Sequence, residues 1–137
     1  MLGNQPRRVR CSRNEIQEDR EGYDRCYSGQ WDSYQRDLSA LTAAYDLTIA
    51  AIDDAETRQK KGCESQFNSC SYSYQALVYT CKRLVSAAAL LNATAAYSTF
   101  QASRAAFELA FFGGVEYCKS LFPCHDGYKI VSGSVGR

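Results

Sequence analysis

Seven cysteines are the residues of this 137-residue chain whose type and number point most clearly to chemistry. They are Cys11, Cys26, Cys63, Cys70, Cys81, Cys118 and Cys124. So many thiols in so short a chain indicate an oxidising compartment, in which cysteines pair as disulfides. Reduced core cysteines are the alternative, which suits one or two thiols better than seven. Because the count is odd, at least one cysteine is free or pairs with another chain, and the connectivity stays open.

Three of these cysteines are expected on one face of one helix. Cys63, Cys70 and Cys81 are separated by seven and eleven residues, which places them within about twenty degrees of each other around a helix. Seven residues of helix span about 10 Å, which is too far for a disulfide within that helix. Each of these three cysteines is therefore expected to pair with a cysteine of another segment. The candidates are Cys11, Cys26, Cys118 and Cys124. Cys118 and Cys124 are expected either to close a local loop or to tie the C-terminal tail to a long helix.

The single histidine is the other candidate for chemistry. His125 directly follows Cys124, and five residues lie between Cys118 and Cys124. A c-type haem site usually has two residues between its cysteines, so the spacing favours a tail disulfide over haem attachment. A zinc site would need a further cysteine, and the chain lacks the tight cysteine pairs of zinc modules. We expect no cofactor and no metal.

No constellation of side chains indicates an enzyme. Nucleophilic catalysis needs a base beside a cysteine or serine, and the one histidine lies in a glycine-rich tail. Asp53 and Asp54 are adjacent on a predicted helix, so their side chains diverge by about 100° and do not share a proton. There is no glycine-rich loop to hold a phosphate. We predict that the chain is not an enzyme.

The charge balance excludes a strongly basic or acidic binding protein. The formal net charge is +1. Four arginines near the N-terminus, Arg7, Arg8, Arg10 and Arg13, are followed at once by five acidic residues. This pattern favours a solvated, self-neutralising stretch over a phosphate-binding arm, and no nucleic-acid partner is expected.

The elements that must position these residues are long helices. The only prolines are Pro6 and Pro123, and the proline-free stretch between them predicts an all-α fold. A first helix, about 12–60, has an apolar stripe in steps of three and four, with charged residues on its other face. The stripe consists of Tyr27, Trp31, Tyr34, Leu38, Leu41, Tyr45, Thr48, Ile52 and Ala55. Lysines followed by Gly62 are expected to end this helix.

A second long helix, about 64–111, is expected to return antiparallel to the first. Its predicted stripe consists of Cys63, Phe67, Cys70, Tyr74, Leu77, Cys81, Leu84, Ala88, Leu91, Ala95 and Ser98. Gly113-Gly114 is expected to break it, and a short C-terminal helix is expected over 115–121, where Pro123 stops it. The chain is predicted to be one helical domain, 1–137, with irregular tails 1–11 and 122–137.

One part of the second helix is expected to have neighbours on every side. The twenty residues 84–103 contain no charge and are long enough to span a bilayer. Several serines, threonines and an asparagine favour a buried helix instead, so membrane contact stays open. Alanines surround the helix, and one partner helix from the same chain cannot cover all of its faces. Another protein or another copy is expected there.

Ten tyrosines point to the same expectation, because they exceed what a two-helix core needs. Tyrosine is favoured at interfaces, where its ring packs and its hydroxyl stays hydrated. Tyr72 and Tyr79 lie off the predicted stripe and are therefore predicted interface residues. The full predicted set is Tyr72, Tyr79, Leu91, Ala95, Phe107 and Phe111.

Over residues 11–81 the cysteine pattern resembles the coiled-coil-helix-coiled-coil-helix (CHCH) group of the mitochondrial intermembrane space. That family carries cysteine pairs nine residues apart, one pair on each helix. Here ten residues lie between Cys70 and Cys81 and six between Cys63 and Cys70, and the first helix lacks a matching pair. The variant spacing is similar to that of some accessory subunits of respiratory complexes. The resemblance implies a non-catalytic, oxidatively folded subunit of an inner-membrane complex.

The start of the chain is consistent with that location, because residues 1–6 contain no apolar signal segment. We therefore predict a structural accessory subunit of a mitochondrial respiratory complex, with other subunits as partners, that braces its neighbours through the Ala-rich helix and tyrosines. The alternative is a secreted, disulfide-rich helical binding protein, such as an inhibitor or effector, in the extracellular space.

Overall fold

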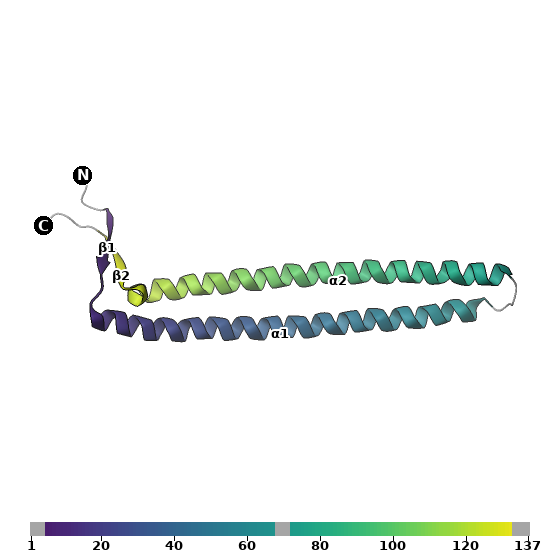
Figure 1. The fold of residues 1–137 in the computed structure, drawn as a ribbon, viewed down its shortest axis with the longest axis horizontal. Helices are drawn as coiled ribbons and strands as arrows, with labels where there is room; N and C mark the ends of the chain where they lie inside the picture. The colour runs from purple at the N-terminus through teal and green to yellow at the C-terminus, as the bar shows by residue number, and fades with distance from the viewer. Residues whose placement is uncertain (1–4, 68–71, 133–137) are drawn as a thin grey trace. The chain divides into compact units, whose positions relative to one another are not determined.

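The computed structural model describes residues 5–67 and 72–132. In chain order its elements are strand β1 (Pro6–Arg10), helix α1 (Arg13–Gln66), helix α2 (Tyr72–Leu121), the 3-10 helix η1 (Pro123–Asp126) and strand β2 (Tyr128–Ser132) (Figure 1). The predicted all-α helical hairpin with disulfides is confirmed.

The chain gathers into two compact units. The terminal unit comprises residues 1–36 and 107–137, and the bend unit comprises residues 37–106. In each unit a segment of α1 lies beside an antiparallel segment of α2 (Figure 1). The two units are described separately below.

Helix α1 begins at a reciprocal cap in the terminal unit. The Ser12 backbone N–H donates to Glu15 Oε1 at 2.8 Å, and the Glu15 N–H donates to Ser12 Oγ at 3.2 Å. This arrangement satisfies two backbone donors that the first turn leaves without helical partners. Lys129 of β2 donates to the other Glu15 carboxylate oxygen at 2.6 Å, and together with the Ser12 contacts it lowers the pKa of Glu15 to about 2. Glu15 therefore joins the start of α1 to β2.

The predicted end of the first helix near residue 60 is wrong, because α1 continues through Gly62 to Gln66. The added turn is held by contacts with α2 inside the bend unit. Cys63 forms a disulfide with Cys81, and Lys82 Nζ donates to Glu64 Oε1 at 2.6 Å. These contacts outweigh the roughly 1 kcal/mol that a glycine costs inside a helix. The second helix correspondingly begins at residue 72 instead of 64.

The predicted break at Gly113-Gly114 is also wrong, because α2 runs through both glycines to Leu121 and includes the segment predicted as a separate short helix. A Cβ on Gly114 would overlap the side chain of Gln30 on α1. The glycine therefore permits a close approach of the two helices, one turn from the disulfide between Cys26 and Cys118. The helix ends before Pro123, as predicted.

Gly22 has the same role on α1, and it yields a testable contrast. A Cβ on Gly22 would overlap the ring of Phe122, whereas a Cβ on Gly29 would meet open space. We expect Gly29→Ala to raise the free energy of unfolding by about 0.5–1 kcal/mol, because alanine favours the helix. Gly22→Ala is expected to lower it, because overlap with a packed ring costs roughly 1–3 kcal/mol. Urea unfolding followed by circular dichroism measures both, and equal stabilisation by the two substitutions would contradict the packing.

The tails predicted to be irregular, 1–11 and 122–137, contain two strands and a 3-10 helix in their described parts, so that prediction is wrong there. Strands β1 and β2 pair antiparallel, with Val9 opposite Lys129. Each strand has only five residues, and its partner comes from the other end of the chain. Local alternation over so short a stretch does not reveal such a pairing.

A disulfide closes the base of this two-stranded ribbon. Cys11 pairs with Cys124, and the Cys11 N–H donates to the Gly127 carbonyl at 3.0 Å. Gly127 has φ of 98°, a conformation that glycine adopts without a steric penalty. Asp19 Oδ2 accepts a 2.6 Å hydrogen bond from the Cys124 N–H. The ribbon and η1 are therefore anchored to the first turns of α1.

The hairpin has almost no fully buried core. The buried hydrophobic side chains among the described residues are all cysteines, namely Cys11, Cys63, Cys118 and Cys124. Two helices side by side can cover only part of each other's surface, so hydrophobic burial alone supplies little stability. The disulfides take over much of the stabilisation that a larger core would provide.

The seam between the helices agrees with most of the prediction on α1 but with little of it on α2. Six residues of the predicted α1 stripe are half-buried, namely Tyr34, Leu38, Leu41, Tyr45, Ile52 and Ala55, whereas Tyr27, Trp31 and Thr48 are exposed, so the prediction is wrong for these three. On α2 the predicted positions Leu77, Leu84, Ala88, Leu91, Ala95 and Ser98 are exposed instead. The positions of α2 that are half-buried in the bend unit include Val78, Val85, Ala89, Ala93, Ala96 and Phe100. The Cys63–Cys81 disulfide and a 3.1 Å hydrogen bond from Ser86 to Glu56 turn this second set toward α1.

Candidate protein-interaction surface

Three disulfides join the elements that carry the candidate surface. They are Cys11–Cys124, Cys26–Cys118 and Cys63–Cys81, with Cα–Cα distances of 5.8, 5.7 and 5.7 Å. The prediction that Cys63 cannot pair with Cys81 is wrong, because α1 extends past Cys63 and the two residues lie on different helices. Cys118 and Cys124 do not close a local loop, since each pairs with a residue near the start of the chain. Cys70 lies outside the described residues.

A sequence signal for two of these pairs exists in the cysteine spacing. Cys63 follows Cys26 by 37 positions, and Cys118 follows Cys81 by 37 positions. In an antiparallel hairpin, equal spacing on the two helices lets both pairs bridge in one register, Cys26 with Cys118 and Cys63 with Cys81. The sequence reasoning missed this equality because it placed Cys63 on the second helix.

An exposed row of leucines lies on α2 in the bend unit. Leu77, Leu84 and Leu91 are 50, 67 and 71% exposed, respectively, and follow one another at intervals of seven residues. Seven residues are close to two helical turns, so the three side chains share one face of the helix. We call these three residues the ridge.

A continuous groove runs along α1 and α2 beside the ridge. It consists of three open depressions of about 300, 370 and 460 Å³. The depressions of 300 and 370 Å³ share the lining residue Thr48. The depressions of 370 and 460 Å³ share Gln59 and Ala88. The lining from α1 includes Leu41, Ala44, Thr48, Ala51, Ala55 and Gln59, and the lining from α2 includes Leu77, Leu84, Ala88, Asn92, Ala96 and Thr99. Two ridge leucines therefore form part of the groove wall.

The groove is nearly uncharged. Among its described lining residues, Glu56 is the one that carries a charge. Lys60 Nζ lies 3.0 Å from Glu56 Oε2, and Ser86 Oγ donates to the same oxygen at 3.1 Å. These two partners lower the pKa of Glu56, with Lys60 as the larger cause. The carboxylate is thus already compensated within the chain.

Charged groups are concentrated at the bend, next to the groove. The Lys82 ammonium donates to Glu64 and lowers the pKa of that carboxyl, and the Tyr74 hydroxyl donates to the Glu64 carbonyl at 3.2 Å. With the Cys63–Cys81 disulfide, these bonds hold the last turn of α1 against the start of α2. The bend end of the groove is therefore rigidly built.

Three of the predicted interface residues in the bend unit, Tyr79, Leu91 and Ala95, are exposed. Tyr79 is 63% exposed, with the Arg83 guanidinium 5.7 Å from its ring centroid. Leu91 belongs to the ridge, and Ala95 is exposed one turn further along the same face of α2. The side chain of Tyr72 lies outside the described residues. The structure thus brings Leu91 and Ala95 onto one surface beside the groove.

The two predicted phenylalanines belong to the terminal unit, where both are half-buried. Phe111 packs against Tyr27, Trp31 and Tyr34, with ring centroids 5.7, 5.7 and 5.3 Å away. This aromatic cluster ties α2 to α1. Phe111 therefore contributes to packing inside the unit. Phe107 is half-buried in the same unit.

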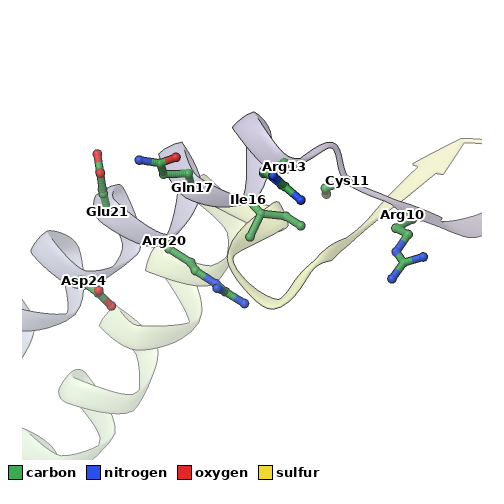
Figure 2. Close-up of a pocket in the computed structure, with 8 residues that line it drawn as sticks. All are labelled: Arg10, Cys11, Arg13, Ile16, Gln17, Arg20, Glu21 and Asp24. Atoms are coloured by element: carbon green, nitrogen blue, oxygen red, sulfur yellow. The ribbon is translucent and has the colours of Figure 1, made fainter.

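A separate depression of about 670 Å³ lies in the terminal unit, beside β1 and the first turns of α1 (Figure 2). It is lined by Arg10, Cys11, Arg13, Ile16, Gln17, Arg20, Glu21 and Asp24. Arg20 Nε donates to the carbonyl of His125 at 3.2 Å. All three arginines are exposed, and Glu21 and Asp24 offset two of their charges. The depression is therefore a weakly charged, solvated surface.

His125, considered above for haem or zinc, packs as a structural residue. Its ring stacks on Tyr23 with centroids 4.2 Å apart, and its Nδ1 lies 2.8 Å from the Phe122 carbonyl. Among the described residues, no group of His, Cys, Asp and Glu side chains is arranged to hold a metal ion. Neither long helix, over the part that the structure describes, contains a segment apolar enough to cross a bilayer.

Comparison with known proteins gives no match: no family model, no curated protein and no solved structure corresponds to this chain. The three disulfides do not by themselves identify the CHCH group. Functional inference therefore rests on the surface described above.

Proposed function

We propose that this chain is a non-catalytic accessory subunit that braces a larger protein assembly through the ridge and groove of its bend unit. The observation that carries the proposal is the row of three leucines, 50–71% exposed, along a groove with one charged lining residue among those described. Burying a leucine side chain contributes about 1.5–3 kcal/mol, and contiguous apolar surface typically marks a contact site. A partner that covers the ridge would gain the part of this free energy that corresponds to the 50–71% of each side chain still exposed.

The groove indicates the chemistry of that partner. Its α1 wall runs from residue 41 to residue 66, which corresponds to about 37 Å of helix. Small residues such as Ala44, Ala51 and Ala55 allow a close approach of another backbone. The matching partner is an uncharged helix with apolar residues at intervals of three and four, as in helix-in-groove recognition.

The bend unit is organised for this contact before the partner arrives. The Cys63–Cys81 disulfide and the bond between Ser86 and Glu56 hold α1 and α2 side by side. Surfaces that are rigid before binding lose less conformational entropy on association. A stapled two-helix surface is therefore suited to a bracing role.

For the location we propose an oxidising compartment, specifically the intermembrane-space side of a mitochondrial respiratory complex. Three disulfides support the oxidising compartment. The mitochondrial location rests on the cysteine-spacing resemblance given above. Fractionation of cells that express the tagged chain, with protease protection of intact mitochondria, separates this proposal from a secreted binding protein, which would appear in the medium.

The test of the function is native purification through a tag, without reductant, followed by mass spectrometry. We expect a stoichiometric set of other subunits with the wild-type chain and with Leu47→Asp, which alters an equally exposed leucine (73%) of α1 that does not line the groove. Leu84→Asp and Leu91→Asp are expected to lose that set. Recovery of the chain without other subunits, or equal recovery with all variants, would refute the proposal.

A further inference from the structure

We infer that a second copy of this chain occupies the surface: the ridge of each copy packs onto the α1 wall of the other copy's groove. The two bend units then form a four-helix bundle with both bends at the same end. This inference rests on the proposed function, because it names the first partner of the same surface.

The first argument is that α2 carries two apolar seams in the bend unit. One seam, which includes Val78, Val85 and Ala89, faces α1. The second runs through Leu77, Cys81, Leu84, Ala88, Leu91, Ala95 and Ser98, in alternating steps of four and three. Such steps are the heptad pattern of helices that pack on other helices. Since the second seam is largely exposed, the hairpin resembles one half of a four-helix bundle.

The second argument concerns the exposed side chains on the two walls of the groove. On the α1 wall they include the small residues Ala44, Thr48 and Ala51, whereas the α2 wall carries the ridge leucines Leu77 and Leu84 beside the smaller Ala88 and Asn92. A two-fold interface uses the same surface on both copies, so that surface must contain both the projections and the hollows. This groove satisfies that condition.

The distribution of sizes also selects the arrangement of the two copies. A two-fold axis parallel to the helices places α2 of one copy over α1 of the other, so the ridge residue Leu91 meets alanines of the partner's α1 wall. An axis across the helices would place the leucine ridge on itself and alanines on alanines, which leaves gaps between the backbones. Close packing favours the first arrangement.

The register of the hairpin then places individual side chains. Cys63 is bonded to Cys81, and the rings of Tyr45 and Phe100 lie 4.8 Å apart. The numbers of each pair add to about 144. Any two residues of α1 and α2 whose numbers add to about 144 therefore lie at the same height along the hairpin, that is, level with each other. In the parallel two-fold arrangement Leu91 is level with position 53 of the partner copy, between its Ala51 and Ala55. Leu91 then fills a hole beside alanine, as in coiled coils, whereas Leu84 and Leu77 are level with positions 60 and 67 of the partner copy.

Charge and size do not oppose the contact. Residues 84–103 contain no charge, and the α1 wall positions 44, 48, 51 and 55 are uncharged. Glu56, Lys60 and Lys82 lie closer to the contact, and each is already paired with an opposite charge within its own copy. Two helices about 10 Å wide and about 37 Å long give a flat contact area of roughly 700 Å² per copy. That approaches the roughly 800 Å² per partner of a standard stable interface.

The experiment is sedimentation equilibrium of the purified, oxidised chain, together with a Cys70→Ser variant that prevents disulfides between chains through this residue. We expect a dimer in both. Leu91→Asp and Ala51→Leu are expected to weaken dimerisation by about 30-fold or more, because one places a charge on the ridge and the other fills its hole. Leu47→Asp is the matched control and should leave the dimer unchanged. Circular dichroism verifies that each variant keeps its helices.

Cross-linking tests the arrangement of the two copies. An equal mixture of ¹⁵N-labelled and unlabelled chains is treated with an amine-reactive cross-linker, and mixed-isotope peptides report links between copies. With both bends at one end, Lys60, Lys61 and Lys82 of one copy lie near those of the other. We expect mixed-isotope links among these lysines. A dimer that gives none of these links would overturn the parallel arrangement.

The outcomes separate this inference from the proposed function. A wild-type chain that is monomeric by sedimentation, or a dimer that Leu91→Asp leaves intact, would overturn the inference. If such a chain still recovers other subunits through the ridge in the native purification, the accessory-subunit proposal stands and the partner is a different protein. A dimer that recovers no other subunit would support the inference and refute the accessory role.

Discussion

Replacing both cysteines of the Cys26–Cys118 disulfide by alanine is expected to lower the free energy of unfolding by about 2–4 kcal/mol. The two residues are 92 positions apart, so the bond removes many conformations from the unfolded chain. Little else compensates for its loss, because cysteines are the buried hydrophobic side chains of the described residues and Cys118 is 0% exposed. Urea unfolding of the oxidised chain, followed by circular dichroism, measures the change.

Removing Cys63 and Cys81 in the same way is the matched control. This disulfide lies in the bend unit, so its loss is expected to reduce hydrogen-exchange protection of bend-unit amides first. The loss of Cys26 and Cys118 is expected to act first on the terminal unit. Local opening follows the cooperative units of a structure, which makes exchange the informative measurement. Identical exchange patterns in the two variants would contradict the division into two units.

The Phe111→Ala substitution is expected to lower the free energy of unfolding by about 2 kcal/mol. Removing a fully buried phenylalanine costs roughly 3–5 kcal/mol, and Phe111 is half-buried. The variant loses ring contacts to Tyr27, Trp31 and Tyr34, which together join α2 to α1 in the terminal unit. Thermal or urea unfolding of the oxidised chain measures the loss.

The neighbouring phenylalanine provides the control. Phe112 is 60% exposed, so Phe112→Ala is expected to change the stability by a much smaller amount, within about 0.5–1 kcal/mol. The comparison also tests the prediction that Phe111 is an interface residue. If Phe111→Ala left stability unchanged but abolished partner recovery, Phe111 would serve binding instead of packing within the chain.

The exposed leucines show how a heptad pattern can be assigned to the wrong contact. The stripe through Leu84 and Leu91 is apolar and has the period of helix packing, so the sequence predicts that it contacts α1. In the structure α1 packs against a neighbouring face of α2, which carries Val85 and Ala89. A helix with apolar residues on two faces offers two seams, and periodicity does not say which one its own chain uses.

The sequence by itself determined the two long helices and their antiparallel connection. Absence of proline between Pro6 and Pro123, apolar steps of three and four, and the stop at Pro123 are local properties that act within a few residues. The cysteine count likewise predicts disulfides, because it reflects the compartment and not the geometry.

Tertiary structure alone decided the features that depend on partners distant in the chain. Helix α1 continues past Gly62, where Cys63 forms its disulfide with Cys81 on α2. Helix α2 continues through Gly114, where the missing side chain leaves room for Gln30 of α1. The β1–β2 ribbon forms because the Cys11–Cys124 disulfide joins the two ends of the chain. In each case a contact between remote residues outweighs a local preference of about 1 kcal/mol or less, and local patterns contain no information about such contacts.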